Sequence, residues 1–285
     1  MNLLIPVQYH SRVYPPDIKP HIQEVAGTFK ANPRPIQGDY SLHTEYSYIG
    51  STFASPALAG CAAIPAAQKA GVPQLWRSRE WALDMARFVV NFAQGHAPKV
   101  IEIHPPFSDY TDLYGFLDTY HAFEAQVRRS FPHVQIFVEN RSGTVYRGGV
   151  FVLSKVEDLC AFSQLIDQAH SSLRITLDLP QLLTAHRLST QKEQELRDVL
   201  ARVKSIRHNI AGIHLWGKRA GRSPHMGNLD TLFRGNEKIK QVFLQGVFDC
   251  FNDDVPRYFV PEVNDHNANL LAIVQDLKDT GFVFL

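Results

Sequence analysis

Cysteine is scarce in this chain, and long apolar runs are absent. The 285 residues include only Cys61, Cys160 and Cys250, and no two of them have the CxxC spacing of a thiolate zinc site. Three widely spaced cysteines also argue against a disulfide framework and favour buried thiols in a reducing compartment. No segment approaches the roughly eighteen apolar residues of a membrane helix, and the chain begins without the basic segment of a secretory signal. We therefore expect a cytoplasmic protein with no membrane partner.

The chain also lacks a strong charge of either sign. Its 29 Lys and Arg and 28 Asp and Glu leave a net charge of +1, whereas non-specific nucleic-acid binding usually shows as a basic excess. No linker rich in Ser, Gly or charge divides the sequence, which predicts a single domain over residues 1–285. A domain of this length buries about three quarters of its unfolded surface. Nothing in the sequence indicates an obligate protein partner.

Short apolar runs alternate with longer stretches of helical periodicity, which predicts a parallel α/β protein. Eight strands are expected, at 3–7, 39–43, 99–104, 134–139, 173–178, 212–215, 258–262 and 282–285. Helices are expected between them, at 76–94, 112–130, 154–170, 190–206, 230–248 and 267–279. Residues 1–38 are expected to hold one strand and an irregular segment, because five of the seventeen prolines lie within 15–38. This pattern predicts a (β/α)8 TIM barrel rather than a doubly wound sheet, since no strand is followed by a Gly-rich phosphate turn.

Five of the expected strands finish with a side chain that can bind a metal. They are His104 in VIEIHPPF, Glu139 in IFVEN, Asp178 in ITLDLP, His214 in GIHLWGK and Glu262 in FVPEVND. The carboxyl ends of barrel strands meet at one face, so these side chains are expected to converge. Any one of them alone would more often be a helix cap or a hydrogen-bonded loop residue. Five buried ionisable groups without compensation would exceed the stability of an ordinary domain, so together they predict a metal site.

The donor set indicates which metals fit. Nitrogen and oxygen donors without thiolate suit zinc, manganese, magnesium or iron, and the share of imidazole favours zinc or manganese. His43 in DYSLHTEYSYIG and His225 in GRSPHMGNLD raise the number of possible ligands to seven. Seven ligands exceed the needs of one ion, and two neighbouring ions can clamp the attacking and leaving oxygens of a phosphoryl displacement. We therefore expect one or two divalent ions.

Cationic and aromatic residues follow the ligand motifs. Lys218 and Arg222 lie in the loop after the fifth motif-bearing strand, and Arg141 directly follows the motif ending in VEN. Such cations make charge-assisted hydrogen bonds to phosphate, although a solvated surface loop is an equal alternative for the first two. Trp216 is either a platform for stacking a base or a wall of the pocket. A phosphorylated small molecule or DNA is the substrate that these residues favour.

Six motifs in order resemble the xylose-isomerase-like barrels, and most closely the endonuclease IV family of apurinic/apyrimidinic endonucleases. The motifs are HTEYSYIG, IEIHPPF, VENRSG, LDLPQLLTAH, IHLWGKRAGRSPHMGNLD and PEVND, all within residues 39–265. The resemblance implies one zinc held by His43, His104 and Glu139, and a second held by Glu139, Asp178, His214 and Glu262. It also implies that Tyr46 occupies the place of an aromatic that enters the DNA at the lesion.

The chain departs from that family at its third zinc. Family members ligate this ion with a His three residues after the strand-end Asp and with an Asp-x-His pair further on. Here the matching positions are Gln181, Ser223 and His225, so two of three ligands are missing. The third ion is therefore either lost or held by other residues such as Asp230.

Three functions remain open from the sequence. The first is a metal-dependent phosphodiesterase or endonuclease-like hydrolase of a phosphate-containing substrate, damaged DNA being the expected one, with Glu139 and Glu262 positioning and deprotonating a water. The second is a single-metal sugar isomerase or epimerase in which Glu139, Asp178, His214 and Glu262 hold the ion. The third is a barrel that binds a partner without catalysis.

Overall fold

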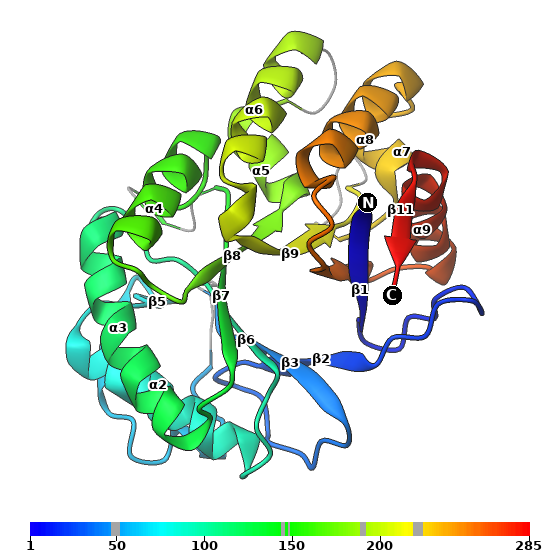
Figure 1. Ribbon diagram of the computed structural model, residues 1–285. Coiled ribbons are helices and arrows are strands. Elements are labelled where there is room, and N and C mark those ends of the chain that lie inside the picture. The colour runs from blue at the N-terminus through cyan, green and yellow to red at the C-terminus, as the bar shows by residue number, and fades with distance from the viewer. Residues whose placement is uncertain (47–51, 144–145, 148, 189–191, 219–224) are drawn as a thin grey trace.

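Eight parallel strands close into a barrel in the computed structural model, which describes residues 1–46, 52–143, 146–147, 149–188, 192–218 and 225–285 (Figure 1). In chain order the barrel strands are β1 (Asn2–Gln8), β2 (Ile22–Gly27), β3 (Asp39–Thr44), β6 (Val100–Ile103), β7 (Gln135–Glu139), β8 (Arg174–Asp178), β9 (Ile210–Leu215) and β10 (Arg257–Pro261). Each strand pairs with the next, and the pairing of β10 with β1 closes the ring. The predicted TIM barrel is confirmed.

Two strand predictions were wrong. The second barrel strand, β2, lies inside the segment that was expected to be irregular, and it pairs with β3 along its whole length. The prolines of this segment lie before and after β2, so they bound the strand without interrupting its hydrogen bonds. The last strand, β11 (Phe282–Phe284), pairs with the first half of β1 and lies outside the closed ring.

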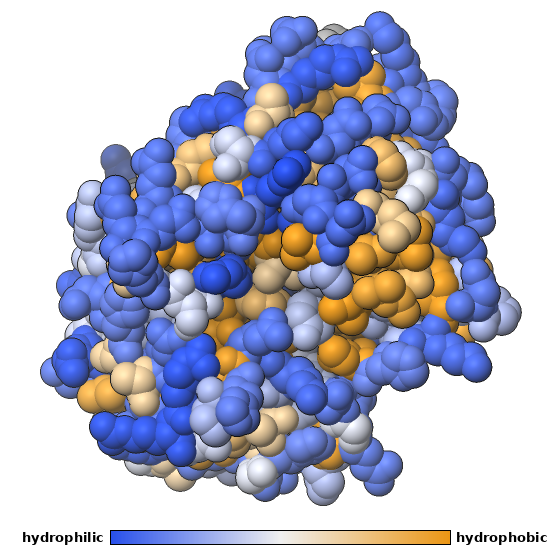
Figure 2. Space-filling model, in the orientation of Figure 1, coloured by the Kyte–Doolittle hydropathy of each residue, from blue (hydrophilic) through white to orange (hydrophobic). Residues whose placement is uncertain are grey.

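Six long helices cover the barrel close to their expected positions. They are α2 (Arg79–Ala93), α3 (Leu113–Ser130), α4 (Val156–Gln168), α6 (Glu193–Ser205), α8 (Glu237–Phe251) and α9 (Asn267–Thr280). The helix expected over 230–248 is divided into α7 (Leu229–Leu232) and α8, because Arg234 and Gly235 take left-handed φ angles of +54° and +73° that end the first piece. Each long helix buries one apolar face, which leaves mostly hydrophilic residues at the rim of the face in Figure 2.

Smaller elements complete the fold. They are α1 (Ala63–Ala66), α5 (Leu179–His186), the 3-10 turns η1 (Pro56–Leu58) and η2 (Arg207–Asn209), and the hairpin of β4 (Gln68–Lys69) and β5 (Val72–Pro73). No helix lies between β1 and β2 or between β2 and β3. Fewer helices therefore cover the barrel beside β1 and β2, which are blue in Figure 1. Within the described ranges, no helix combines the length and apolar character needed to cross a membrane.

Candidate metal centre

The strand-end residues predicted as ligands lie at one end of the barrel. Glu139 and Asp178 are the last residues of β7 and β8, and His43 and His214 are the next-to-last residues of β3 and β9. His104 and Glu262 directly follow β6 and β10. All but His43 are at most 4% exposed, so the site is an enclosed set of ionisable groups.

Three imidazoles surround one oxygen of Glu139. The Oε2 atom of Glu139 lies 3.2 Å from His104 Nε2, 3.5 Å from His43 Nε2 and 3.6 Å from His214 Nδ1. The Nε2 atoms of His43 and His104 are themselves 3.0 Å apart. His43, His104 and Glu139 thus bring three donor atoms together, which matches the first of the two predicted ligand sets.

A second set of donors adjoins the first through Glu139. Asp178, His214 and Glu262 have donor atoms within 4.8 Å of one another, and His214 Nδ1 lies 3.3 Å from Glu262 Oε1. His225 extends this set, because its Nδ1 atom is 3.2 Å from Glu262 Oε2. The structure therefore brings all seven predicted ligands into two neighbouring clusters that share Glu139.

Two carboxylates of the centre were missed in the sequence. Glu24 in β2 lies 3.3 Å from His43 Nδ1, and Glu102 in β6 lies 3.2 Å from His214 Nε2. A signal for Glu102 was present, because it precedes His104 by two residues and alternate residues of a strand share one face. Glu24 had no such signal, since its strand was not recognised.

The crowding of these groups perturbs their pKa values. Burial raises the pKa of Glu139, and the charge of Glu262 raises it further, to about 7. Burial lowers the pKa of His43, but Glu24, Glu102 and Glu139 outweigh this effect and raise it to about 10. Burial likewise opposes ionisation of Glu102, yet the imidazoles led by His214 hold its pKa down at about 2. In the metal-free protein, protons on imidazoles thus neutralise part of the negative charge.

The donor chemistry of the cluster fits divalent metal ions. Several of its buried polar atoms lie within ion-pair distance of one another but form no well-directed hydrogen bond among the described residues: Glu102 Oε1, Glu139 Oε1, His225 Nδ1, Glu262 Oε2 and both ring nitrogens of His214. Five carboxylates take part in the overlapping groups of donor atoms, namely Glu24, Glu102, Glu139, Asp178 and Glu262. Two divalent ions together with the adjacent Arg141 would balance their five negative charges with neutral histidines. Such balance matters because an uncompensated buried charge costs several kcal/mol.

Asp178 is held rigidly by its neighbours. Its backbone N–H donates to Asn140 Oδ1 at 2.9 Å, and its backbone oxygen accepts from Asn140 Nδ2 at 3.1 Å. Trp216 Nε1 donates to Asp178 Oδ2 at 2.9 Å, and the Gln181 backbone N–H donates to Oδ1 at 2.8 Å. Trp216 is 2% exposed, so it forms a wall of the centre and offers no open ring face for stacking.

The third zinc site of the resembled family has no counterpart among the described residues. Gln181, in the place of a ligand His, instead accepts hydrogen bonds from the backbone and hydroxyl of Ser142. Ser223 lies outside the described residues. Asp230, considered as a replacement ligand, instead pairs with Lys240 at 2.7 Å.

A glycine allows the His225 loop to approach the barrel. A Cβ atom on Gly217 would lie 2.2 Å from the backbone oxygen of Asn228, so only glycine fits this contact. The Gly217 N–H donates to the Gly227 oxygen at 3.1 Å, which joins the two described segments on either side of residues 219–224. His225 itself takes a φ of +64°, a strained conformation for a residue with a side chain. The strain is consistent with a functional position for this imidazole.

A cavity of about 400 Å³ opens onto the centre beside His43, Glu262 and His225. Arg141 and Tyr46 form part of its wall, and the guanidinium lies 5.2 Å above the tyrosine ring and 3.8 Å from Glu139 Oε1. The Nε atom of Arg141 is buried and has no hydrogen-bond partner among the described residues. Tyr46 and Arg141, which were both predicted to bind substrate, therefore lie at the cavity.

The predicted basic loop contributes little that the structure describes. Lys218 is exposed and is not among the described residues that line the cavity. Arg222 lies outside the described residues. The phosphate-binding role expected for these two residues stays a prediction.

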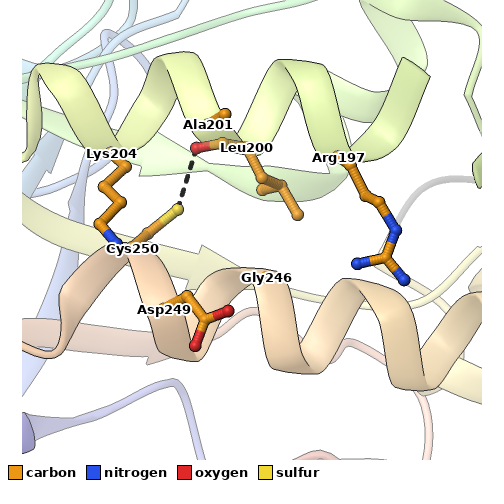
Figure 3. A pocket seen from close by; sticks show the side chains of 7 residues that line it. All are labelled: Arg197, Leu200, Ala201, Lys204, Gly246, Asp249 and Cys250. Atoms are coloured by element: carbon orange, nitrogen blue, oxygen red, sulfur yellow. Dashed lines mark hydrogen bonds between the residues drawn. The ribbon is translucent and has the colours of Figure 1, made fainter. Parts of the chain in front are cut away.

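A separate cavity of about 240 Å³ lies on the outer surface between α6 and α8 (Figure 3). Arg197 and Lys204 project from α6, and Cys250 on α8 donates a hydrogen bond to the Leu200 oxygen at 3.0 Å. Gly246 permits the close approach, because a Cβ there would lie 2.4 Å from Leu200 Cδ1. This cavity shares no residue with the metal centre and reflects how two helices pack.

Comparisons with known proteins return solved structures alone. No family model matches the chain, and no curated protein matches its sequence. Solved structures similar to it include an AP endonuclease and a xylose isomerase domain protein, and also a GH53 catalytic domain and a PEP mutase/isocitrate lyase superfamily member. An AP endonuclease of family 2 from Brucella melitensis has 9% identity and a TM-score of 0.48, covering 82% of this chain and 87% of its own. A xylose isomerase domain protein from Planctomyces limnophilus has 11% identity and a TM-score of 0.45, covering 98% and 94%. A probable 3-DHS dehydratase involved in petrobactin synthesis from Bacillus anthracis has 13% identity and a TM-score of 0.44, covering 69% of each chain. Such distant likenesses assign no activity to this chain.

Proposed function

We propose that this chain is a metal-dependent hydrolase of phosphate esters that acts on damaged DNA, as in DNA repair. The observation that carries the proposal is the pair of ligand clusters that meet at Glu139, whose five carboxylates would be balanced by two divalent ions and Arg141. Zinc or manganese ions bound there would lower the pKa of a water molecule and neutralise charge on the phosphate.

The residues of the chain would divide the remaining work. Glu139 and Glu262 would hold the attacking water and accept its proton, because both carboxylates lie beside the same nitrogen, His214 Nδ1. Arg141, which lines the cavity, would bind the phosphate through its guanidinium group. The Tyr46 ring, 5.6 Å from the His104 ring and beside the same cavity, supplies a surface for the exposed sugar or base at the lesion.

The proposal is tested with protein reloaded with zinc or manganese. We expect two ions per chain by elemental analysis, and cleavage of a duplex with one abasic site and of bis(4-nitrophenyl) phosphate. Glu262→Gln is expected to lower kcat by about 10² to 10⁴, the usual contribution of a general base. The exposed Glu195→Gln serves as the matched control. If the two-ion protein cleaves no phosphate ester, the proposal is wrong.

A single-metal sugar isomerase or epimerase is the second candidate. One observation favours it: Asp178, His214 and Glu262 form a complete cluster without His43 and His104, whose rings stack at 4.8 Å and contact each other directly. In this case Glu139 and Glu262 would pass a proton between adjacent carbons of a ketose. His104→Ala separates the two candidates, because a hydrolase of this design loses one ion and the isomerase keeps its metal.

A further inference from the structure

His43, His104 and His214 each direct one ring nitrogen toward Glu139. The other ring nitrogen of each histidine lies within hydrogen-bonding distance of a different oxygen atom. A neutral imidazole carries its proton on one nitrogen and offers a lone pair on the other, so an acceptor on one side decides which nitrogen can bind a metal. The outer contacts are His43 Nδ1 to Glu24 Oε1 at 3.3 Å, His104 Nδ1 to the Glu45 backbone oxygen at 3.2 Å, and His214 Nε2 to Glu102 Oε1 at 3.2 Å.

Glu102 is buried inside the barrel beside His214. It belongs to β6, is 4% exposed, and is not among the described residues that line the cavity. Thr176 on β8 donates a hydrogen bond to Glu102 Oε2 at 3.0 Å, which leaves Oε1 facing His214. A buried carboxylate is costly unless it is paired, and this one pairs with His214. Contact with substrate does not explain its presence.

Glu24 occupies the corresponding place at the other cluster. It belongs to β2, and its side chain is 8% exposed at the edge of the cavity. Its Oε1 atom faces Nδ1 of His43, whose Nε2 atom faces Glu139. The two carboxylates therefore contact opposite nitrogens of their histidines, Nδ1 in one case and Nε2 in the other.

We propose that Glu102 and Glu24 are positioning residues, one for each metal ion. Glu102 keeps the proton of His214 on Nε2, so that this histidine offers Nδ1 to the cluster of Asp178 and Glu262. Glu24 keeps the proton of His43 on Nδ1, so that this histidine offers Nε2 to the cluster of His104 and Glu139. The inference rests on the two-ion centre of the proposed function and is independent of the reaction catalysed there.

A role for Glu102 as ligand of a third ion is the competing explanation, since its donor atom lies within 4.8 Å of those of Glu139 and His214. The charge count disfavours it. Two divalent ions and Arg141 would neutralise the five carboxylates, so a third ion would leave two excess positive charges in an enclosed site. The positioning role leaves the site neutral.

The test measures the affinity of each ion by chelator competition and the state of each ring by ¹⁵N NMR of histidine-labelled, zinc-loaded protein. Glu102→Gln is expected to weaken one ion by about 10- to 100-fold, the usual effect of losing such a partner, and to shift the His214 signals alone. Glu24→Gln is expected to weaken the other ion and to shift the His43 signals. Glu195→Gln, on the exposed surface of α6, is the matched control and should change neither.

Thr176→Val provides a second test in case Glu102→Gln does not fold. This variant keeps the Glu102 charge but removes the hydrogen bond from Thr176 that orients the carboxylate. We expect a smaller loss for the same ion as in Glu102→Gln, with unchanged circular dichroism. Unaltered affinities in both glutamine variants would overturn the inference, as would equal loss of both ions in each, or a third ion that Glu102→Gln removes. Reciprocal metal loss without phosphate-ester cleavage would overturn the proposed function alone.

Discussion

Replacing Glu139 with glutamine should weaken both metal ions at once, because this carboxylate contacts imidazoles of both clusters. Its Oε2 atom is 3.2 to 3.6 Å from nitrogens of His43, His104 and His214. Glutamine keeps the shape of the side chain and removes one of five negative charges. Breaking a buried charge cluster by neutralising one partner costs about 3 to 5 kcal/mol. At 1.4 kcal/mol per factor of ten, Kd should rise by about a hundredfold to a few thousandfold.

The measurement is metal affinity by competition with a chromogenic chelator, combined with elemental analysis of the dialysed protein. Wild type should retain two ions per chain under conditions in which Glu139→Gln retains neither. The exposed Glu195, which pairs with Lys192 on the surface of α6, provides the matched glutamine control. Circular dichroism of the metal-free proteins establishes that the fold is intact.

Two outcomes would refute the reasoning. If Glu139→Gln binds both ions within about threefold of wild type, the carboxylate is not shared between them. If it loses one ion and keeps the other with full affinity, Glu139 belongs to a single cluster, and the second cluster is complete without it. The latter result would favour the single-metal isomerase.

Three further predictions follow from the same geometry. In the metal-free protein the pKa of His43 is raised to about 10 from 6.5, so its stabilising proton is fully present below pH 6.5 and lost as pH rises through 10. The melting temperature should therefore fall between pH 7 and 10, and saturating zinc should abolish that fall. Arg141→Ala should raise KM for a phosphate ester about tenfold or more with metal content unchanged, whereas the exposed Arg129→Ala should leave KM unaltered. Gly217→Ala should lower the free energy of unfolding by about 1 to 3 kcal/mol in a denaturant titration, because the new Cβ meets the backbone of Asn228, and a value equal to wild type would show that the loop gives way freely.

The barrel was predictable because its strands and helices differ in hydrophobic period. Buried parallel strands are short continuous apolar runs, and the helices α2 to α9 that cover them carry a single apolar stripe. The strand β2, within residues 15–38, was not predictable from hydrophobic period. The prolines of this segment suggest an irregular conformation, but they only flank β2, which is held in the barrel by its pairing with β3. The division between α7 and α8 was also missed, because a left-handed turn at Arg234 leaves the apolar period almost undisturbed.

The convergence of the predicted ligands was predictable for a different reason. The carboxyl ends of parallel strands must meet at one face, so a recurring donor at those ends predicts convergence without any knowledge of distances. The number of ions does not follow from that pattern, because it depends on which donor atoms lie close enough together to bind the same ion. Glu139 lies between the two clusters only because β7 is central among the strands that bear the ligands.

The carboxylates behind the histidines show what a one-dimensional pattern omits. Glu102 is the Cα partner of His43 across the pairing of β6 with β3, yet its carboxylate contacts His214 on β9. Glu24 is the Cα partner of Ser41, but its side chain contacts His43, which lies two residues further along β3. Neither contact follows from strand register, because inward side chains meet across the barrel as well as along it. An acidic residue in the middle of an apolar run such as VIEI is nevertheless a usable signal. Its burial is costly, so it predicts a partner inside the barrel before that partner can be named.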